Sequence, residues 1–159
     1  MTQLAIFNES KKRTHIAIMK KSWGLTKKIL TGEKTIESRW YKNRYRPWNH
    51  INAGDDIYFK DSGEPVTVKA NVHKVFQFEN LNPQKVREIL LKYAKDDGLG
   101  IESGQIEKFY EMFKNKRFCL IIFLKGAKKI KPFNIDKSGF GSQAAWLVVK
   151  DIDKIKKRL

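Results

Sequence analysis

Residues 30–40 read LTGEKTIESRW, a stretch in which the end of a helix is followed by a strand. Apolar residues recur at helical spacing over residues 22–31, so a short amphipathic helix is expected there. Gly32 supplies the stop, because glycine adopts the left-handed conformation at a helix end without strain. Residues 35–40 then alternate as a strand in which Ile36 points toward the core.

The other face of this predicted strand is charged. This face carries Thr35, Glu37 and Arg39, and Lys34 immediately precedes the strand. The Glu37 carboxylate is thus held among cations. This pattern suits recognition of a base edge, or stabilisation of a phosphate or acyl transition state. A cross-strand salt-bridge ladder that serves only the fold explains the same spacing equally well.

Periodicity and turn residues predict the remaining elements. Strands are expected over residues 14–20, 56–60, 66–78, 118–125 and 144–149, and helices over residues 82–98, 103–116 and 151–159. The parity of apolar residues changes near His73 and Lys74, which predicts a bulge in the long strand. The order of these elements favours one α+β domain over residues 1–159, built on a small β-barrel with a helical insertion at about residues 81–117.

Composition agrees with a soluble, globular, cytoplasmic domain. The 159 residues are 41% hydrophobic, and their longest apolar run, residues 118–124, is far too short to cross a bilayer. Cys119 is the single cysteine, which excludes an intramolecular disulfide and a cysteine-based metal site. The three histidines lack ligand-like spacing and no nucleotide fingerprint is present, so neither metal nor cofactor is expected. No obligate protein partner is evident.

Charge points to a polyanion as partner. The 33 Lys and Arg against 17 Asp and Glu give a formal charge of +16. Residues 1–50 hold 12 basic and 3 acidic side chains, residues 51–120 hold 11 of each, and residues 121–159 hold 10 and 3. If the two ends of the chain pack together, they form one positive face, as nucleic-acid-binding domains do. A uniformly basic, solubilising surface is the alternative.

Two further segments are candidates for nucleic-acid contact. Residues 39–50, RWYKNRYRPWNH, interleave aromatic and basic side chains, the pattern of a single-strand platform on which each stacked base gains about 1–3 kcal/mol. Burial of Trp40 or Trp48 as a plug at one end of the barrel is the competing interpretation. Residues 137–143, KSGFGSQ, form a glycine-rich loop that suits a phosphate beside Lys131 and Lys137, although an ordinary tight turn is favoured.

Gly32, Lys34, Glu37 and Arg39 match the G-x-K-x-x-E-x-R signature, by which the chain resembles ASCH domain proteins of the PUA-like superfamily. The similarity extends over residues 14–149. The resemblance implies a PUA-like barrel of five to six strands with flanking helices, whose cleft beside the first helix binds RNA or a modified nucleoside.

The primary hypothesis is therefore an RNA-binding module for single-stranded or modified RNA, with DNA as a possible ligand. Its candidate nucleic-acid-binding residues are Lys20, Lys21, Trp23, Lys27, Lys28, Lys34, Glu37, Arg39, Trp40, Tyr41, Arg44, Tyr45, Arg46, Trp48, Lys131 and Lys137.

An enzyme that uses the same cleft is the second hypothesis, with Lys34, Glu37 and Arg39 as catalytic residues. Some ASCH proteins resemble metal-independent ribonucleases, and here Glu37 would accept the 2′-hydroxyl proton. Others deacylate N4-acetylcytidine with a Lys, a Thr three residues later and a Glu. Lys34 matches the first, but Glu37 occupies the Thr position, and only Asp96 or Asp97 matches the Glu loosely.

A modified-base reader is the third hypothesis, because EVE and YTH modules are related to this superfamily. Trp23, Trp40 and Trp48 are the candidates for its aromatic cage. Such a cage requires ring faces that converge on one point.

Overall fold

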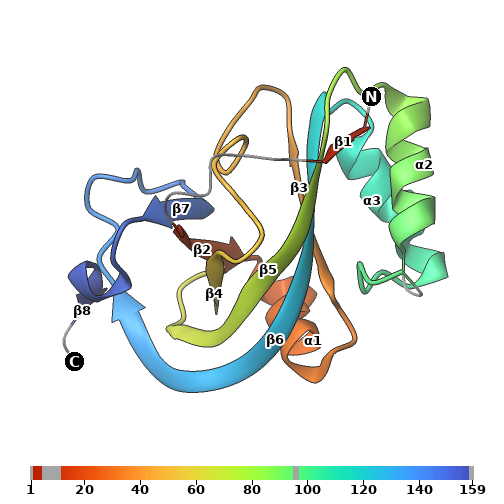
Figure 1. Ribbon diagram of the computed structural model, residues 1–159. Helices are drawn as coiled ribbons and strands as arrows, with labels where there is room; N and C mark the ends of the chain where they lie inside the picture. The colour runs from red at the N-terminus through yellow and green to blue at the C-terminus, as the bar shows by residue number, and fades with distance from the viewer. Residues whose placement is uncertain (1, 5–11, 95–96, 158–159) are drawn as a thin grey trace.

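One strongly curved sheet organises the chain, and the computed structural model describes residues 2–4, 12–94 and 97–157 (Figure 1). Its strands are β1 (Thr2–Leu4), β2 (Thr14–Met19), β3 (Ile36–Tyr41), β4 (Asp56–Asp61), β5 (Val66–Phe78), β6 (Phe118–Ile135), β7 (Trp146–Val149) and β8 (Lys156–Lys157). The helices are α1 (Leu25–Thr31), α2 (Pro83–Tyr93) and α3 (Ile106–Phe113), with 3-10 turns η1 (Lys21–Trp23), η2 (Ser103–Gln105) and η3 (Ile152–Lys154).

The main sheet is a six-stranded half-barrel. Its strand order is β3-β6-β5-β4-β2-β7, with β1 added to β5 and β8 to β6. Among the strands of the described residues, only β2 and β4 run parallel, because the chain between them crosses over through α1 and β3. The terminal strands β3 and β7 have no ladder with one another in the described residues, so the barrel stays open between them. The predicted α+β fold of five to six main strands is confirmed.

The long strands bend around the core. The register of β5 against β6 shifts between Val72 and Lys74, which confirms the predicted bulge. Strand β6 continues to Ile135, ten residues beyond its predicted end. The extension was not predicted because the second half of the strand is Lys-rich and lacks apolar alternation. The helix predicted over residues 151–159 is wrong: of the described residues there, Ile152–Lys154 form the 3-10 turn η3, and residues 158–159 lie outside the described part of the chain. Residues 156–157 instead pair with Asn134 and Ile135 as β8.

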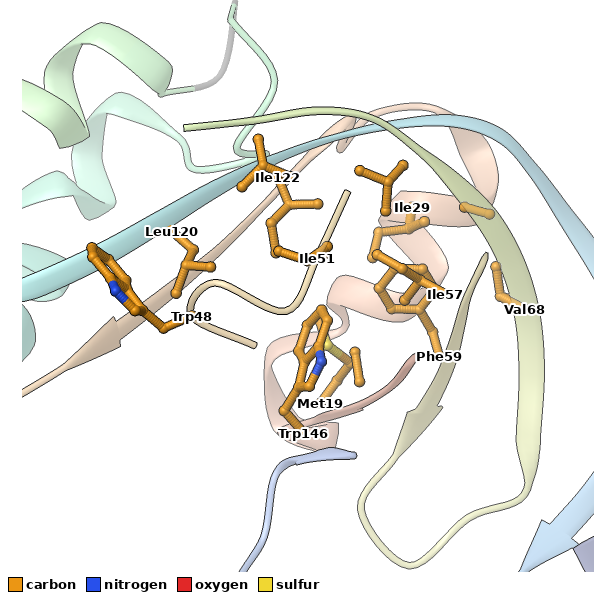
Figure 2. Packing of buried hydrophobic residues seen from close by; sticks show 14 residues of the cluster. Met19, Ile29, Trp48, Ile51, Ile57, Phe59, Val68, Leu120, Ile122 and Trp146 are labelled. Atoms are coloured by element: carbon orange, nitrogen blue, oxygen red, sulfur yellow. The ribbon is translucent and has the colours of Figure 1, made fainter. Parts of the chain in front are cut away.

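Two layers of apolar side chains cover the faces of the sheet. Leu120 and Ile122 of β6 point into the half-barrel, where α1 inserts Ile29 (Figure 2). Cys119 and Ile121 point the other way, against the helical insertion. An almost continuous apolar run such as residues 118–124 is typical of a strand that is buried on both faces.

Helices α2 and α3 lie side by side against β3, β5 and β6 (Figure 1). Asn82 caps α2 by accepting a hydrogen bond from the Lys85 N–H at 2.9 Å, and the buried residues of the helix are Val86, Ile89, Leu90 and Tyr93. Helix α3 is shorter than predicted, and Phe109 is its fully buried residue. No helix among the described residues has the length and apolarity needed to cross a membrane.

A buried histidine lies within the core. The Asp55 carboxylate lies 2.8 Å from His15 Nε2, and the Trp146 indole N–H donates to His15 Nδ1 at 3.0 Å. An indole N–H can only donate, so Nδ1 is unprotonated and Nε2 carries the hydrogen of a neutral ring. Burial lowers the pKa of His15 from its ordinary 6.5, and this effect exceeds the opposing influence of Asp55.

The free energy of unfolding should therefore fall as the pH is lowered below about 6.5, because the unfolded chain takes up a proton before folded His15 does. Denaturation of wild type and His15→Gln between pH 7 and 5 tests this. In His15→Gln, the free energy of unfolding should depend less on pH, by up to about 1.4 kcal/mol per pH unit. In His73→Gln, which changes an exposed position, the pH dependence should be the same as in wild type. Equal slopes for wild type and His15→Gln would contradict the assignment.

Candidate functional site

Lys34 is the buried cation at the start of the signature strand. Gly32 ends α1 with a φ of 84°, and Lys34 follows with its side chain only 3% exposed. Its Nζ donates to Ile36 O at 2.6 Å and Leu99 O at 2.9 Å, and lies 3.4 Å from Glu37 Oε1. Three acceptors match the three N–H bonds of an ammonium group, so the cation is satisfied inside the protein.

Glu37 and Arg39 extend this network across the opening of the half-barrel. Glu37 Oε2 accepts from Arg39 Nε at 3.0 Å and from Nη2 at 2.8 Å. The same guanidinium donates to Ala145 O at 3.2 Å and Ile18 O at 3.4 Å, and lies 5.1 Å from the Trp146 ring centroid. Arg39 thus bridges β3 to β2 and to the chain that enters β7, where no ladder closes the barrel.

The loop after α2 completes the network from the insertion. Gly98 O accepts from the N–H groups of Thr35 at 2.8 Å and Ile36 at 2.9 Å, and Gly100 O accepts from Lys28 Nζ at 3.0 Å. A Cβ at Gly98 would lie 2.3 Å from Thr35 Oγ1, and one at Gly100 3.0 Å from Lys34 Cβ. Both glycines are needed because the loop backbone lies against the signature strand.

A cleft of about 470 Å³ opens beside these charges. Its polar side includes Lys20, Glu37, Arg39 and Lys137, together with the chain at Ser142. Its apolar side combines aromatic residues of η1, β3 and α3 with the loop after α2, namely Trp23, Trp40, Phe109, Phe113, Leu99 and Ile101. The volume falls in the range of about 300–1,000 Å³ that is typical of small-ligand sites.

The aromatic side chains of the cleft differ in how much ring surface they offer. Trp40 stacks on Phe113 at 4.9 Å between ring centroids, with planes 5° apart, and is almost fully buried. Trp23 is half-buried, meets Phe109 edge-on at 5.5 Å and has Lys20 Nζ 5.2 Å from its centroid. Trp23 is therefore the most exposed of the four tryptophans.

The environment perturbs two titratable groups of the cleft. Burial lowers the pKa of Lys34, and this outweighs the opposing influence of the Glu37 carboxylate. Burial also raises the pKa of Tyr41 to about 12. The Tyr41 hydroxyl donates to Arg46 O at 2.9 Å, so it is oriented toward the backbone rather than toward a ligand.

Half of the predicted residues line the cleft. These are Lys20, Trp23, Lys34, Glu37, Arg39, Trp40, Tyr41 and Lys137. The other half do not, namely Lys21, Lys27, Lys28, Arg44, Tyr45, Arg46, Trp48 and Lys131.

The residues outside the cleft have other contacts or positions. Lys21 pairs with Glu64, and Arg46 donates to Trp146 O at 2.8 Å. Trp48 packs in the inner core, so it cannot complete a cage with Trp23 and Trp40.

The deacylase comparison also finds no third member here. Thr35 and Asp97 do not line the cleft, and Asp96 lies outside the described residues. No cluster of three His, Cys, Asp or Glu side chains suited to a metal occurs in the described part of the chain.

Sequence reasoning missed the contribution of the insertion. Leu99, Ile101, Phe109 and Phe113 all line the cleft, although none of the predicted nucleic-acid-binding residues lies in the helical insertion at residues 81–117. The available signal was the Gly-Leu-Gly at residues 98–100, whose spaced glycines indicate a close backbone approach.

Replacement of Lys34 by Met should lower the free energy of unfolding by about 3–5 kcal/mol, because Glu37 would lose one of its two buried cationic partners. Chemical denaturation measures this. Lys27→Met removes the same charge from an exposed position on α1 and should change stability by less than about 0.5 kcal/mol. Similar losses in the two variants would contradict the buried role of Lys34.

Gly98→Ala should be more destabilising than Gly63→Ala. Both residues have positive φ, 120° and 81°, but only Gly98 has a neighbour that a Cβ would strike. Left-handed strain costs about 1–2 kcal/mol at either position, and overpacking adds about 1–3 kcal/mol at Gly98. Equal decreases in Tm for the two variants would show that the loop at Gly98 is not in close contact with the signature strand.

No protein-family model and no curated protein matches the chain, but solved structures do. The ASCH protein of Zymomonas mobilis is 13% identical, with a TM-score of 0.63 over 93% of this chain and 99% of that one. A tyrosine-to-phenylalanine variant of the Zymomonas mobilis protein is 14% identical, with a TM-score of 0.63 over 90% of this chain and 94% of that one. At this identity the likeness concerns the fold alone. The chain therefore has the ASCH, PUA-like fold that its signature residues predict.

Proposed function

We propose that this chain is an RNA-binding module that holds one unstacked base in the cleft. The observation that carries the proposal is the composition of the cleft, which aromatic and cationic side chains line together. Proteins that bind single strands combine these two features, because bases stack on rings while cations hold the phosphates. An RNA ligand is favoured over DNA because sequence-specific RNA recognition mostly uses unstacked bases of single strands.

The half-buried Trp23 ring offers the stacking surface. Hydrogen bonds to the base are available from β3, whose second edge faces the cleft. Residues of an antiparallel strand direct their backbone groups alternately to the two sides, and Ile36 O already bonds Lys34 on the cleft side. Ser38 and Trp40 have the same phase and line the cleft, so their backbone N–H and C=O groups suit a base edge.

Lys20 and Lys137 are the cations proposed to meet the phosphates. Lys20 is exposed, and Lys137 is half-buried, donating to Ser142 O at 3.1 Å and Ala144 O at 3.0 Å. Two acceptors leave the third N–H of the Lys137 ammonium available for a ligand. Lys34 and Glu37 act as positioning residues in this proposal, because they fix the cleft without a free charge of their own.

No contact favours the enzymatic alternatives over binding. Lys34 has an acceptor for each N–H, and Glu37 Oε2 already accepts two bonds from Arg39. A general base or an electrostatic catalyst needs a polar atom free to meet the substrate. A modified-base reader with a tryptophan cage is likewise not favoured, because Phe113 covers one face of Trp40.

Trp23→Ala should weaken binding of a labelled five-nucleotide RNA by about 5- to 150-fold, equivalent to a loss of about 1–3 kcal/mol of stacking. Fluorescence anisotropy measures this. Lys108→Gln, on the exposed side of α3, should bind as wild type does. A loss on Tyr45→Ala with none on Trp23→Ala would contradict the cleft and favour the surface platform of residues 39–50.

Incubation of labelled RNA and of N4-acetylcytidine with metal-free protein tests the enzymatic alternatives. We expect both substrates to remain intact. Turnover that disappears in Glu37→Gln, with RNA affinity retained, would replace the binding proposal with a hydrolase.

A further inference from the structure

A lysine-rich sheet edge lies outside the cleft. The β3 ladder on β6 ends at Phe123, and the β8 ladder begins only at Asn134. Between these points β6 carries four exposed lysines, at Lys125, Lys128, Lys129 and Lys131, which we refer to as the edge lysines. Figure 1 shows this half of β6 curving away from α2 and α3 toward β8.

The charge of this region is not balanced locally. Neither β5 nor β6 contains an Asp or Glu over their 13 and 18 residues. The ion pairs found among the described residues include none of the edge lysines. The edge lysines therefore present several positive charges on one strand.

The strand register places a further lysine against them. Lys69 of β5 stands directly opposite Lys128 of β6. Like charges in this position destabilise a sheet. Lys69 Nζ lies 3.8 Å from Asp56, which also pairs with Lys12 at 3.2 Å, and 5.5 Å from the Tyr58 ring centroid. These contacts offset the repulsion between Lys69 and Lys128 on the Lys69 side, whereas Lys128 takes part in no ion pair found among the described residues.

Protection of an open sheet edge explains only part of this pattern. Proteins place lysines on free edges to prevent pairing with other chains. That purpose does not require Lys69, which belongs to an interior strand of the sheet.

We propose that the edge lysines and Lys69 bind the phosphates of a nucleic acid at a second surface, separate from the cleft. Lysine ammonium groups are flexible point charges, so the contact is independent of sequence. None of these five side chains lines the cleft. The proposal shares its ligand class with the proposed function but not its site, so each can fail alone.

Two triple variants with equal charge test the second surface. One carries Lys125→Gln, Lys128→Gln and Lys131→Gln. The control carries Lys85→Gln, Lys108→Gln and Lys150→Gln, at exposed positions elsewhere. Anisotropy over a series of salt concentrations, with a 30-nucleotide RNA and a 20-base-pair DNA duplex, gives the dependence of affinity on salt.

The edge variant should show a log–log salt slope shallower by up to about 2 for the single strand and about 3 for the duplex. The control should change far less. Equal changes in both variants would overturn the proposal, since only net charge would then matter. A difference confined to one ligand identifies whether single strands or duplexes use the surface.

Further measurements separate this surface from the cleft and from other roles of the lysines. The edge variant should bind the five-nucleotide RNA with the affinity of wild type. If wild type does not bind that RNA at all, the proposed function of the cleft is overturned, and the duplex DNA measurement still tests the second surface. Self-association of the edge variant in size-exclusion chromatography, together with an unchanged salt dependence of its nucleic-acid affinity, would overturn the proposal. The lysines would then serve to prevent this sheet edge from pairing with other chains. Edge-dependent binding to phosphatidylserine vesicles with unchanged nucleic-acid slopes would also overturn it.

Discussion

The site depends on the buried ammonium group of Lys34. Removal of a cation from water costs several kcal/mol, and the cost is offset only when acceptors surround the charge. Here those acceptors come from β3 and from the loop after α2, at Ile36 O, Glu37 and Leu99 O. One side chain therefore connects the signature strand with the insertion, and the wall of the cleft is fixed as a consequence.

The cleft lies where the barrel does not close. Strands β3 and β7 end the sheet without a shared ladder, and Arg39 spans the gap with hydrogen bonds to Ala145 O and Ile18 O. A closed barrel would offer no free strand edge and no room for aromatic side chains from α3. The opening between β3 and β7 thus leaves backbone groups of β3 available for hydrogen bonds to a ligand. It also forms the cleft that aromatic rings and cations line.

Local patterns predicted the elements, whereas long-range contacts decided the site. The stop at Gly32 and the bulge near Lys74 are both local and are confirmed. The contact of Leu99 with Lys34 joins residues 65 apart in the chain, so the spaced glycines at residues 98 and 100 indicate a close backbone approach but not its partner. Periodicity also could not show that Trp48 fills the inner core, because both a plug and a platform use the same aromatic residues.

Amide hydrogen exchange at Thr35 and Ile36 tests the central claim most directly, because both N–H groups bond to Gly98 O on the loop that Lys34 holds. Comparison of wild type with Lys34→Met should show faster exchange at these two amides, while Val75 and Ile122, paired in the β5–β6 ladder, keep their protection. Unchanged protection at Thr35 and Ile36 in a folded variant would show that the loop is held without Lys34, and would contradict the account.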